Sequence, residues 1–334
     1  MTHCERMTEK PERMTEKPQA NYDVIVIGGG SAGLSGAVML GRSRRSVLVI
    51  DGGRPRNAPA AGVHGFLTRD GLPPAELVAI GRDEAQRYGA RILDDEVIGV
   101  GGDVDSGFVV TTVGGVRAEA RRLLVTTGLV DELPDIPGLA ERWGKDLLHC
   151  PYCHGWEVRD QAIGILGVNA MSLHQAQMFR QLSADIVVFL NDELRPTDDE
   201  RTQLTARGIR LVEGKVAAVR SDSDAIAGVV LADGTFVARQ ALTVTPRFVA
   251  RAAFLEDLGL QSVPHPMGVG DYIPADESGV TAIPGVWAAG NVSNLMAQVG
   301  AAAAAGAMAG AHINGDLIAA ETRAAVAELS SSVS

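Results

Sequence analysis

The chain has 334 residues, of which 46% are hydrophobic and 4% aromatic, and its formal net charge is −11. This length predicts about two domains, and the acidic balance argues against nucleic acid or an anionic membrane surface as a partner. No apolar run reaches the roughly 18 to 20 residues of a membrane span, and three cysteines are too few for a disulfide scaffold.

The first twenty residues contain a repeat. The letters ERMTEKP occur at residues 5–11 and again at 12–18, and no charged-then-apolar signal-peptide pattern accompanies them. We interpret residues 1–20 as a flexible leader with no part in the fold, and we expect a cytoplasmic protein.

A strand, a glycine-rich turn and a helix come next. Residues 23–27 (DVIVI) have the apolar, β-branched pattern of a buried parallel strand, and residues 34–40 continue as a helix. In the GGGSAG segment between them, Gly28 permits a tight turn and Gly30 lets a pyrophosphate approach the backbone. Gly33 lets helix and strand pack closely.

A second strand at residues 46–50 ends in Asp51, eighteen residues after Gly33. An acid at this place typically binds the ribose hydroxyls of a dinucleotide. The register predicts a dinucleotide site, and a plain glycine-rich turn is the alternative. The predicted cofactor residues of this unit are Gly28, Gly30, Ser31, Ala32, Gly33, Asp51 and Gly52.

Residues 52–74 form a connection rich in glycine and proline. Long connections in compact α/β domains are often functional, so Asn57 and His64 are candidates to face a flavin or a substrate. A turn-capping asparagine and a surface histidine are equally open interpretations.

A helix is predicted at residues 74–88, followed by strands at 91–100, 108–113 and 123–126. Short antiparallel strands inserted after a first βαβ unit favour a flavoprotein over a plain dehydrogenase. Gly128 ends the last strand in a turn of small residues, which lets the backbone come close to a dinucleotide.

After a linker, the segment HCPYCHGWE at residues 149–157 has the character of a redox centre. Cys150 and Cys153 can close a disulfide and exchange electrons with another dithiol. His149 and His154 flank the pair and Glu157 follows, so these residues are candidates for proton transfer near neutral pH. A structural CxxC, satisfied structural histidines and a solvated Glu157 are the alternatives. A zinc site would need a second CxxC, which the sequence lacks, so no metal site is expected.

A second βαβ unit is predicted from a strand at 162–166, a helix at 175–182 and a strand at 186–190. Its turn is not GxGxxG: the middle glycine is replaced by Leu166 or by Asn169, depending on where the motif begins. No basic cluster follows the second strand: the next residues are Asn191, Asp192 and Glu193, where a 2′-phosphate would need an arginine. The pattern therefore predicts a degenerate nucleotide site that does not bind NADPH.

The last motif is a strand ending in AAGN, followed by a helix whose first turn has only small side chains. Such a helix N-terminus can stabilise an anionic reduced flavin. Close packing of an alanine-rich core helix is the alternative. The predicted cofactor residues here are Gly128 from the earlier strand, Gly290, Asn291, Gln298 and Val299.

The order of GGGSAG, TTG, CPYC, a second βαβ unit and AAGN resembles the low-molecular-weight thioredoxin reductase family over about residues 21–320. HCPYCHGWE resembles the branch with the dithiol oxidases of gliotoxin and holomycin biosynthesis. The resemblance implies two Rossmann-like, three-layer α/β domains and a homodimer. An FAD-binding domain would comprise residues 21–130 and 246–334, and an NAD(P)-binding-like domain with the CxxC would comprise residues 131–245. It also implies that Cys153 lies against the flavin while Cys150 exchanges with substrate.

The chain departs from the reductase pattern at the CxxC and at AAGN. His154 replaces the acid after the second cysteine, and Asn291 replaces an aspartate. We therefore expect an FAD-dependent oxidase that closes a disulfide in a small-molecule dithiol and passes the electrons to O₂, giving H₂O₂. An NADPH- or ferredoxin-dependent disulfide reductase and a non-catalytic flavin-binding redox sensor are the alternatives.

Overall fold

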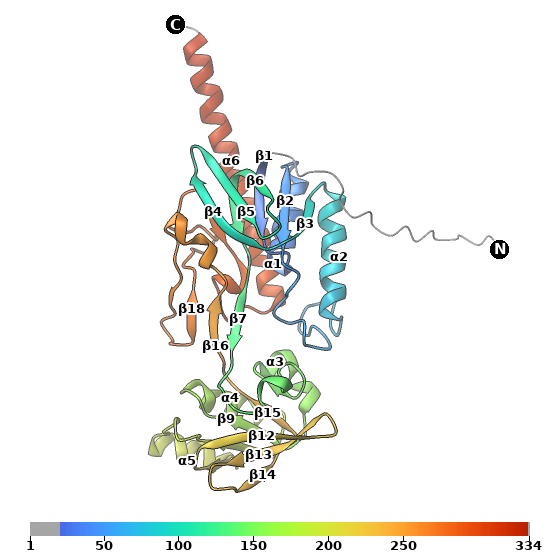
Figure 1. Cartoon of the computed structure of the whole chain (residues 1–334), viewed down its shortest axis with the longest axis vertical. Coiled ribbons are helices and arrows are strands. Elements are labelled where there is room, and N and C mark those ends of the chain that lie inside the picture. The colour runs from blue at the N-terminus through green and yellow to red at the C-terminus, as the bar shows by residue number, and fades with distance from the viewer. Residues whose placement is uncertain (1–20, 333–334) are drawn as a thin grey trace, which may run out of the picture.

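The computed structural model describes residues 21–332, which form two bodies joined by two strands (Figure 1). The repeated leader lies outside the described residues. In Figure 1 the upper body holds the first strands of the chain and also its last helix, whereas the middle of the chain builds the lower body. The upper body is therefore discontinuous in sequence.

A seven-stranded sheet forms the centre of the upper body. β1 pairs in parallel with β2 and β6, and the predicted antiparallel insert extends the sheet through β5 and β4. Most side chains of the central parallel strands are buried, which explains their continuous apolar runs. The strands are β1 (Asn21–Ile27), β2 (Val47–Asp51), β3 (Arg91–Asp94), β4 (Val97–Asp103), β5 (Gly107–Thr112), β6 (Arg117–Val125) and β19 (Val286–Ala288).

Two helices, α1 (Ser31–Arg42) and α6 (Val299–Ser332), pack backbone against backbone beside this sheet. A Cβ atom on Gly306 would lie 1.9 Å from the carbonyl oxygen of Ala32, so only glycine permits this approach. The contact brings the first turns of both helices to one end of the sheet. α2 (Pro74–Arg87) flanks α1. Within residues 21–332, no helix is both long and apolar enough to cross a bilayer.

A five-stranded parallel sheet forms the centre of the lower body, with helices on one face and a three-stranded antiparallel sheet on the other. β9, α4 and β10 are the predicted second βαβ unit, because β9 and β10 pair in parallel. The elements are β8 (Leu147–Leu148), β9 (Ile163–Leu166), α4 (Met171–Phe179), β10 (Ile186–Phe189), α5 (Asp198–Ala206), β11 (Arg210–Val212), β12 (Val216–Asp222), β13 (Ala225–Leu231), β14 (Phe236–Ala238) and β15 (Ala241–Thr243).

The two bodies are connected by β7 (Leu129–Glu132) and β16 (Arg247–Ala250), which pair antiparallel (Figure 1). β17 (Val263–Pro264) and β18 (Gly270–Tyr272) complete a four-stranded sheet with them. Both chain crossings therefore run side by side.

Several element boundaries differ from the sequence expectation. The run predicted as one strand at 91–100 is two strands, because the chain turns at Asp95 and Glu96 between β3 and β4. The helix predicted at 175–182 begins at Met171, where the side chain of Asn169 accepts a hydrogen bond from the first helical N–H. The sequence pattern does not predict β7 or β16 at all, because both are short and carry charged residues.

Candidate active site

A cavity of about 1110 Å³ is lined by residues from both bodies. Among the predicted site residues, only Gly33 and Glu157 are absent from its lining. Those that line it are Gly28, Gly30, Ser31, Ala32, Asp51, Gly52, Asn57, His64, Gly128, His149, Cys150, Cys153, His154, Gly290, Asn291, Gln298 and Val299.

The glycine-rich turn has the geometry of a dinucleotide cradle. Gly28 has φ +107°, and a Cβ there would lie 2.5 Å from the carbonyl oxygen of Thr126. A Cβ on Gly33 would lie 1.9 Å from the carbonyl oxygen of Gly28, which explains why Gly33 packs inside the turn rather than lining the cavity. Around Gly30 there is open space, and no side chain caps the N-terminus of α1. Free helical N–H groups beside open space suit a pyrophosphate.

Asp51 ends β2 at the same edge of the sheet. Its carboxyl group lies against Gly29, where a Cβ would come within 2.6 Å, and its Oδ2 lies 3.4 Å from Nη1 of Arg82. The carboxylate therefore has the place predicted for an acid that accepts hydrogen bonds from ribose hydroxyls. Together with the glycine turn, it makes the upper body fit an adenine dinucleotide such as FAD.

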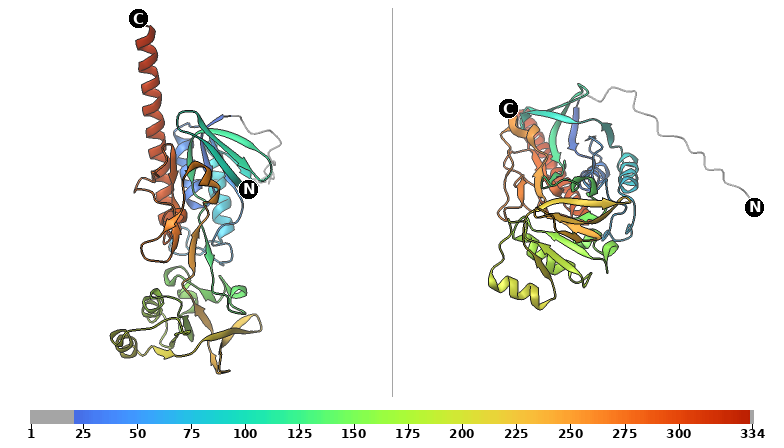
Figure 2. Two further views of the ribbon diagram at one scale, coloured as in Figure 1. Left: turned by 60° about the vertical axis from the view of Figure 1, so that its left-hand side comes forward. Right: turned by 60° about the horizontal axis from the view of Figure 1, so that its bottom comes forward.

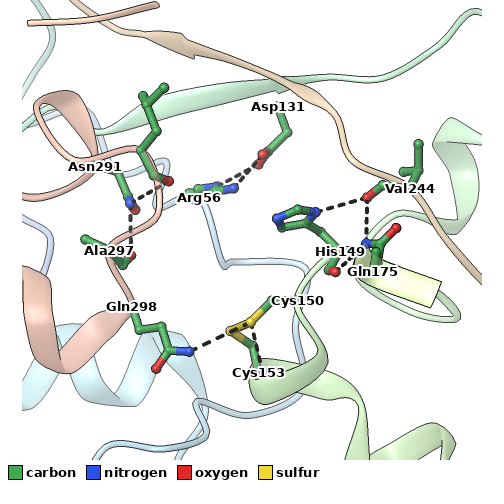
Figure 3. Close-up of a disulfide and its surroundings, with 11 residues drawn as sticks. Arg56, Asp131, His149, Cys150, Cys153, Gln175, Val244, Asn291, Ala297 and Gln298 are labelled. Atoms are coloured by element: carbon green, nitrogen blue, oxygen red, sulfur yellow. Dashed lines mark hydrogen bonds and ion pairs between the residues drawn. A yellow bond between two sulfur atoms is a disulfide. The ribbon is translucent and has the colours of Figure 1, made fainter. Parts of the chain in front are cut away.

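Asn291 shapes the loop that leads into α6. Its Nδ2 donates to the carbonyl oxygens of Asn294 and Leu295 at 3.1 and 3.3 Å. It also donates to the carbonyl oxygen of Ala297 at 2.9 Å (Figure 3). Because three acceptors surround it, this position needs a donor, and an aspartate could not serve. The asparagine in AAGN is therefore built into the loop conformation.

Cys150 and Cys153 form a disulfide at the start of the short helix α3 (Pro151–His154). The backbone N–H of Cys153 donates to Sγ of Cys150 at 3.2 Å, and Nε2 of Gln298 lies 3.9 Å from the same sulfur (Figure 3). Two donors directed at one sulfur stabilise negative charge on it. These two donors therefore suit Cys150 to carry negative charge as a thiolate.

His149 lies at the junction of the two bodies. Its Nδ1 donates to the carbonyl oxygen of Val244 at 3.1 Å, and its own carbonyl accepts from Nε2 of Gln175 at 2.7 Å (Figure 3). Since a carbonyl can only accept, the ring proton is on Nδ1, and Nε2 of the neutral ring is free to take a proton. Burial lowers the pKa of His149, against the hydrogen bond to Val244, so the ring is neutral at pH 7.

His154 lies on the other side of the cysteine pair, and its Nε2 is buried without a hydrogen-bond partner among the described residues. Burial lowers the pKa of His154, although the nearby Glu157 carboxylate opposes the shift. The ring of His64 meets it edge-on at 6.3 Å. His64 in turn lies 3.4 Å from the Glu157 carboxylate through Nε2 and 3.5 Å from Asp70 through Nδ1.

In the turn of the second βαβ unit, a side chain occupies a place that a nucleotide-binding turn gives to glycine. Gly164 lies inside β9, where a Cβ would lie 2.6 Å from the side chain of Leu242, so Gly164 serves strand packing and not the turn. Asn169 therefore has the place of the middle glycine, and its Oδ1 accepts from the N–H of Met171 at 3.0 Å. That N–H group is one that a phosphate would otherwise use.

The chain resembles known proteins in sequence and in structure. The profile of the family described as "Pyridine nucleotide-disulphide oxidoreductase" matches residues 22–306. The chain belongs to this family. This member of the pyridine nucleotide-disulphide oxidoreductase family is a flavin-dependent thiol/disulfide oxidoreductase, and its fold is of the thioredoxin reductase type.

Three relatives show how far the likeness extends. The structure of HlmI is 43% identical, with a TM-score of 0.88 over 96% of this chain and 99% of that one. Thioredoxin reductase sirT of Leptosphaeria maculans is 31% identical over 88% of this chain and 93% of its own. A probable thioredoxin reductase of Arthroderma benhamiae is 39% identical over 53% of this chain, and the match spans only 46% of that protein.

Several lining residues of this oxidoreductase are not among those predicted from the sequence. Arg56 and Asp131 form an ion pair in the cavity lining, but one lies in a loop and the other on the unpredicted strand β7 (Figure 3). Met171, Gln175 and Met178 share one face of α4, and their spacing of four and three residues could have indicated that face.

Proposed function

We propose that the chain is an FAD-dependent dithiol oxidase, which closes an intramolecular disulfide in a small-molecule dithiol and passes the electrons to O₂, giving H₂O₂. The observation that carries the proposal is that the dinucleotide turn, the cysteine pair and two histidines line one and the same cavity. The resemblance of HCPYCHGWE to the gliotoxin- and holomycin-type oxidases supports the same direction of electron flow.

The cysteine pair would take two electrons from the substrate by two exchanges. One substrate thiolate attacks Sγ of Cys150, the disulfide breaks, and Cys153 receives the electron pair. The second substrate thiolate then attacks the substrate sulfur of the mixed disulfide, and Cys150 leaves as a thiolate. The substrate thereby loses two electrons and two protons, the protons go to the histidines, and the protein disulfide becomes a pair of thiolates. The N–H of Cys153 and the amide of Gln298 favour the second step, because both donors are directed at the leaving sulfur.

The two histidines would receive the substrate protons. Nε2 of His149 is unprotonated in the tautomer fixed by Val244, and Nε2 of His154 has no partner among the described residues. A neutral imidazole with a free ring nitrogen is a general base at neutral pH. Glu157 would hold His64 rather than contact a thiol.

The upper body would hold the cofactor. The turn from Gly28 to Ala32 would bind its pyrophosphate, and Asp51 would accept from its ribose hydroxyls. FAD bound there would take the electron pair from the reduced cysteines and deliver it to O₂. In this proposal the FAD-binding domain comprises residues 21–130 and 246–334. Residues 131–245 form the NAD(P)-binding-like domain that carries the cysteine pair. A cytoplasmic homodimer likewise stays a prediction.

The alternative is a reductase that takes electrons from NADPH or ferredoxin, as the names of several relatives suggest. The hydrogen bond from Met171 to Asn169 argues against NADPH, because it occupies the first helical N–H group, which would otherwise be available to a phosphate. Leu190 ends the run that contains β10, and the next three residues are Asn191, Asp192 and Glu193, which give a 2′-phosphate no cation.

Anaerobic mixing of the FAD-loaded protein with NADPH and, separately, with dithiothreitol tests the direction of electron flow. We expect the dithiol to bleach the flavin absorbance and NADPH to leave it unchanged. Admission of air should restore the absorbance and release one H₂O₂ for each dithiol oxidised. Bleaching by NADPH at a comparable rate would contradict the oxidase proposal.

A further inference from the structure

An ion pair at the junction of the two bodies has no role in the exchange steps. Arg56, from the loop after β2, pairs with Asp131 on β7 through two parallel hydrogen bonds of 2.8 and 2.6 Å (Figure 3). The Asp131 side chain is only 5% exposed. A two-point contact between a guanidinium and a buried carboxylate fixes both groups in place.

One aromatic ring, that of Phe248, contacts both the Arg56 guanidinium and the ring of His149. The central carbon of Arg56 lies 5.0 Å from the ring centre of Phe248, and the ring of His149 meets that ring edge-on at 5.2 Å. Phe248 stands opposite Asp131 in the β7–β16 pairing. Arg56 therefore touches both connecting strands, and all four side chains form one cluster.

Arg56 and Asp131 are the charged groups that act on His149, and they act in opposite directions. The cation of Arg56 lowers the pKa of His149, and the carboxylate of Asp131 raises it, while burial is the largest cause of the lowered value. The remaining polar contact of the ring, to the carbonyl of Val244, carries no net charge.

We propose that Arg56 and Asp131 are positioning residues for His149, which hold its ring against Phe248 and set how readily Nε2 takes a proton. Only the consequence for turnover rests on the proposed function. The effect on the protonation of His149 belongs to the resting protein and stands without it.

The opposite signs of the two charges separate this role from a merely structural one. Arg56→Met leaves the carboxylate of Asp131 unpaired near the ring, which favours imidazolium, so His149 should titrate at higher pH. Asp131→Asn leaves the guanidinium alone, so His149 should titrate at lower pH. Loss of a structural contact alone would not move the two titrations apart.

The measurement is a pH titration of the histidine ring ¹³Cε1 resonances in the oxidised, FAD-loaded protein, with His149→Gln to assign the signal. We expect Arg56→Met and Asp131→Asn to move the His149 midpoint to opposite sides of the wild type. Arg56→Lys should stay near the wild type, because the charge remains. The double variant leaves neither charge buried without its partner, so it remains usable if a single variant fails to fold, and its midpoint should lie between those of the singles.

Arg247→Met is the matched control. Arg247 also joins the two connecting strands, pairing with Glu132 at 2.8 Å and with Asp271, but its side chain is half exposed and is not one of the charged groups that shift the pKa of His149. We expect no change in the His149 midpoint. Equal midpoints in Arg56→Met, Asp131→Asn and wild type, or shifts of one sign, would overturn the positioning role.

Turnover separates this inference from the proposed function. In the anaerobic reduction by dithiothreitol, the acid limb of the rate should follow the His149 midpoint, moving to higher pH in Arg56→Met and to lower pH in Asp131→Asn. Midpoints that move while the acid limb stays would support the positioning role and would remove His149 as the base.

Discussion

His149 and His154 are prepared as bases in different ways. A carbonyl fixes the tautomer of His149, so that one ring nitrogen is committed to a hydrogen bond and the other is free. His154 keeps a free Nε2 because none of the described residues approaches it with suitable geometry. Burial lowers the pKa of both rings. Each ring therefore stays neutral, and able to take a thiol proton, at a pH where an exposed histidine would already be charged.

Replacement of one cysteine at a time should abolish oxidase turnover while FAD stays bound, because the cofactor residues of the upper body do not depend on the disulfide. Turnover is measured as H₂O₂ release, and FAD binding as retained flavin absorbance after gel filtration. Full activity in Cys150→Ser or Cys153→Ser would contradict the CxxC mechanism.

The roles of the two sulfurs can be separated with the same variants in a Cys4→Ser background, which removes the thiol of the leader. Treated with a small aromatic disulfide, Cys153→Ser should give a stable adduct at Cys150, seen by mass spectrometry. A faster adduct at Cys153 in Cys150→Ser would reverse the assignment of the exchanging sulfur.

At the scale of elements, the contact between α1 and α6 decides where the cofactor residues lie. Gly306 and Gly310 of α6 meet the backbone of α1 at Ala32 and Gly36, so the two helices approach more closely than side chains would allow. Because Ala32 also lines the cavity, the same contact aligns the first turn of α1 with the start of α6. The alanine-rich composition of α6 therefore serves close packing as well as the proposed flavin site.

Gly306→Ala should destabilise the protein, because the new Cβ would lie 1.9 Å from the backbone oxygen of Ala32 and the helices would have to separate. The expected cost is about 1–3 kcal/mol, with weaker FAD retention. Gly315→Ala is the control in the same helix: its Cβ meets nothing within 4 Å, and it should stabilise by about 0.5–1 kcal/mol. Urea unfolding of both FAD-loaded variants gives the comparison, and equal stability would contradict the packing argument.

At the scale of the whole molecule, α6 brings the end of the described chain back to the upper body, which also contains its first strand. Beyond the contact with α1 the helix projects past the upper body, as the left view in Figure 2 shows, and residues 321–332 are exposed. Glu321 links α6 to the rest of the upper body. It pairs with Arg45 at 2.5 Å and Arg121 at 2.7 Å, and Arg121 also pairs with Asp23 on β1.

The two arginines, whose hydrogen bonds are the largest cause, lower the pKa of Glu321 to about 2. A depressed carboxyl pKa means that its stabilisation is complete above about 4.5 and is lost as the pH falls toward 2. Glu321→Gln should therefore lower the melting temperature at pH 7 but not near pH 2. The effect is expected to be about 1 kcal/mol or less, since the side chain is 43% exposed. Thermal melting from pH 7 to pH 2 measures it, and a pH-independent difference would show that the ion pairs contribute nothing.

The sequence by itself determined the chemistry-bearing units of this oxidoreductase. GGGSAG between a strand and a helix, Asp51 at the end of the next strand, and two cysteines in one short segment are local patterns, because turn geometry and strand burial depend on neighbouring residues. The fold class and the family followed from the order of these units, and both are confirmed.

Only the tertiary structure decided which of these units meet. Arg56, Asp131 and Phe248 come from a loop and two connecting strands far apart in sequence, so no spacing rule could place them around His149. The tautomer of His149 depends on Val244, which is 95 residues away. The structure also decided which residue replaces the middle glycine of the second nucleotide turn. Gly164 packs against Leu242 and is not part of the turn, so Asn169 has that position. Long-range contacts of this kind are set by how the sheets and strands stack, which local patterns do not encode.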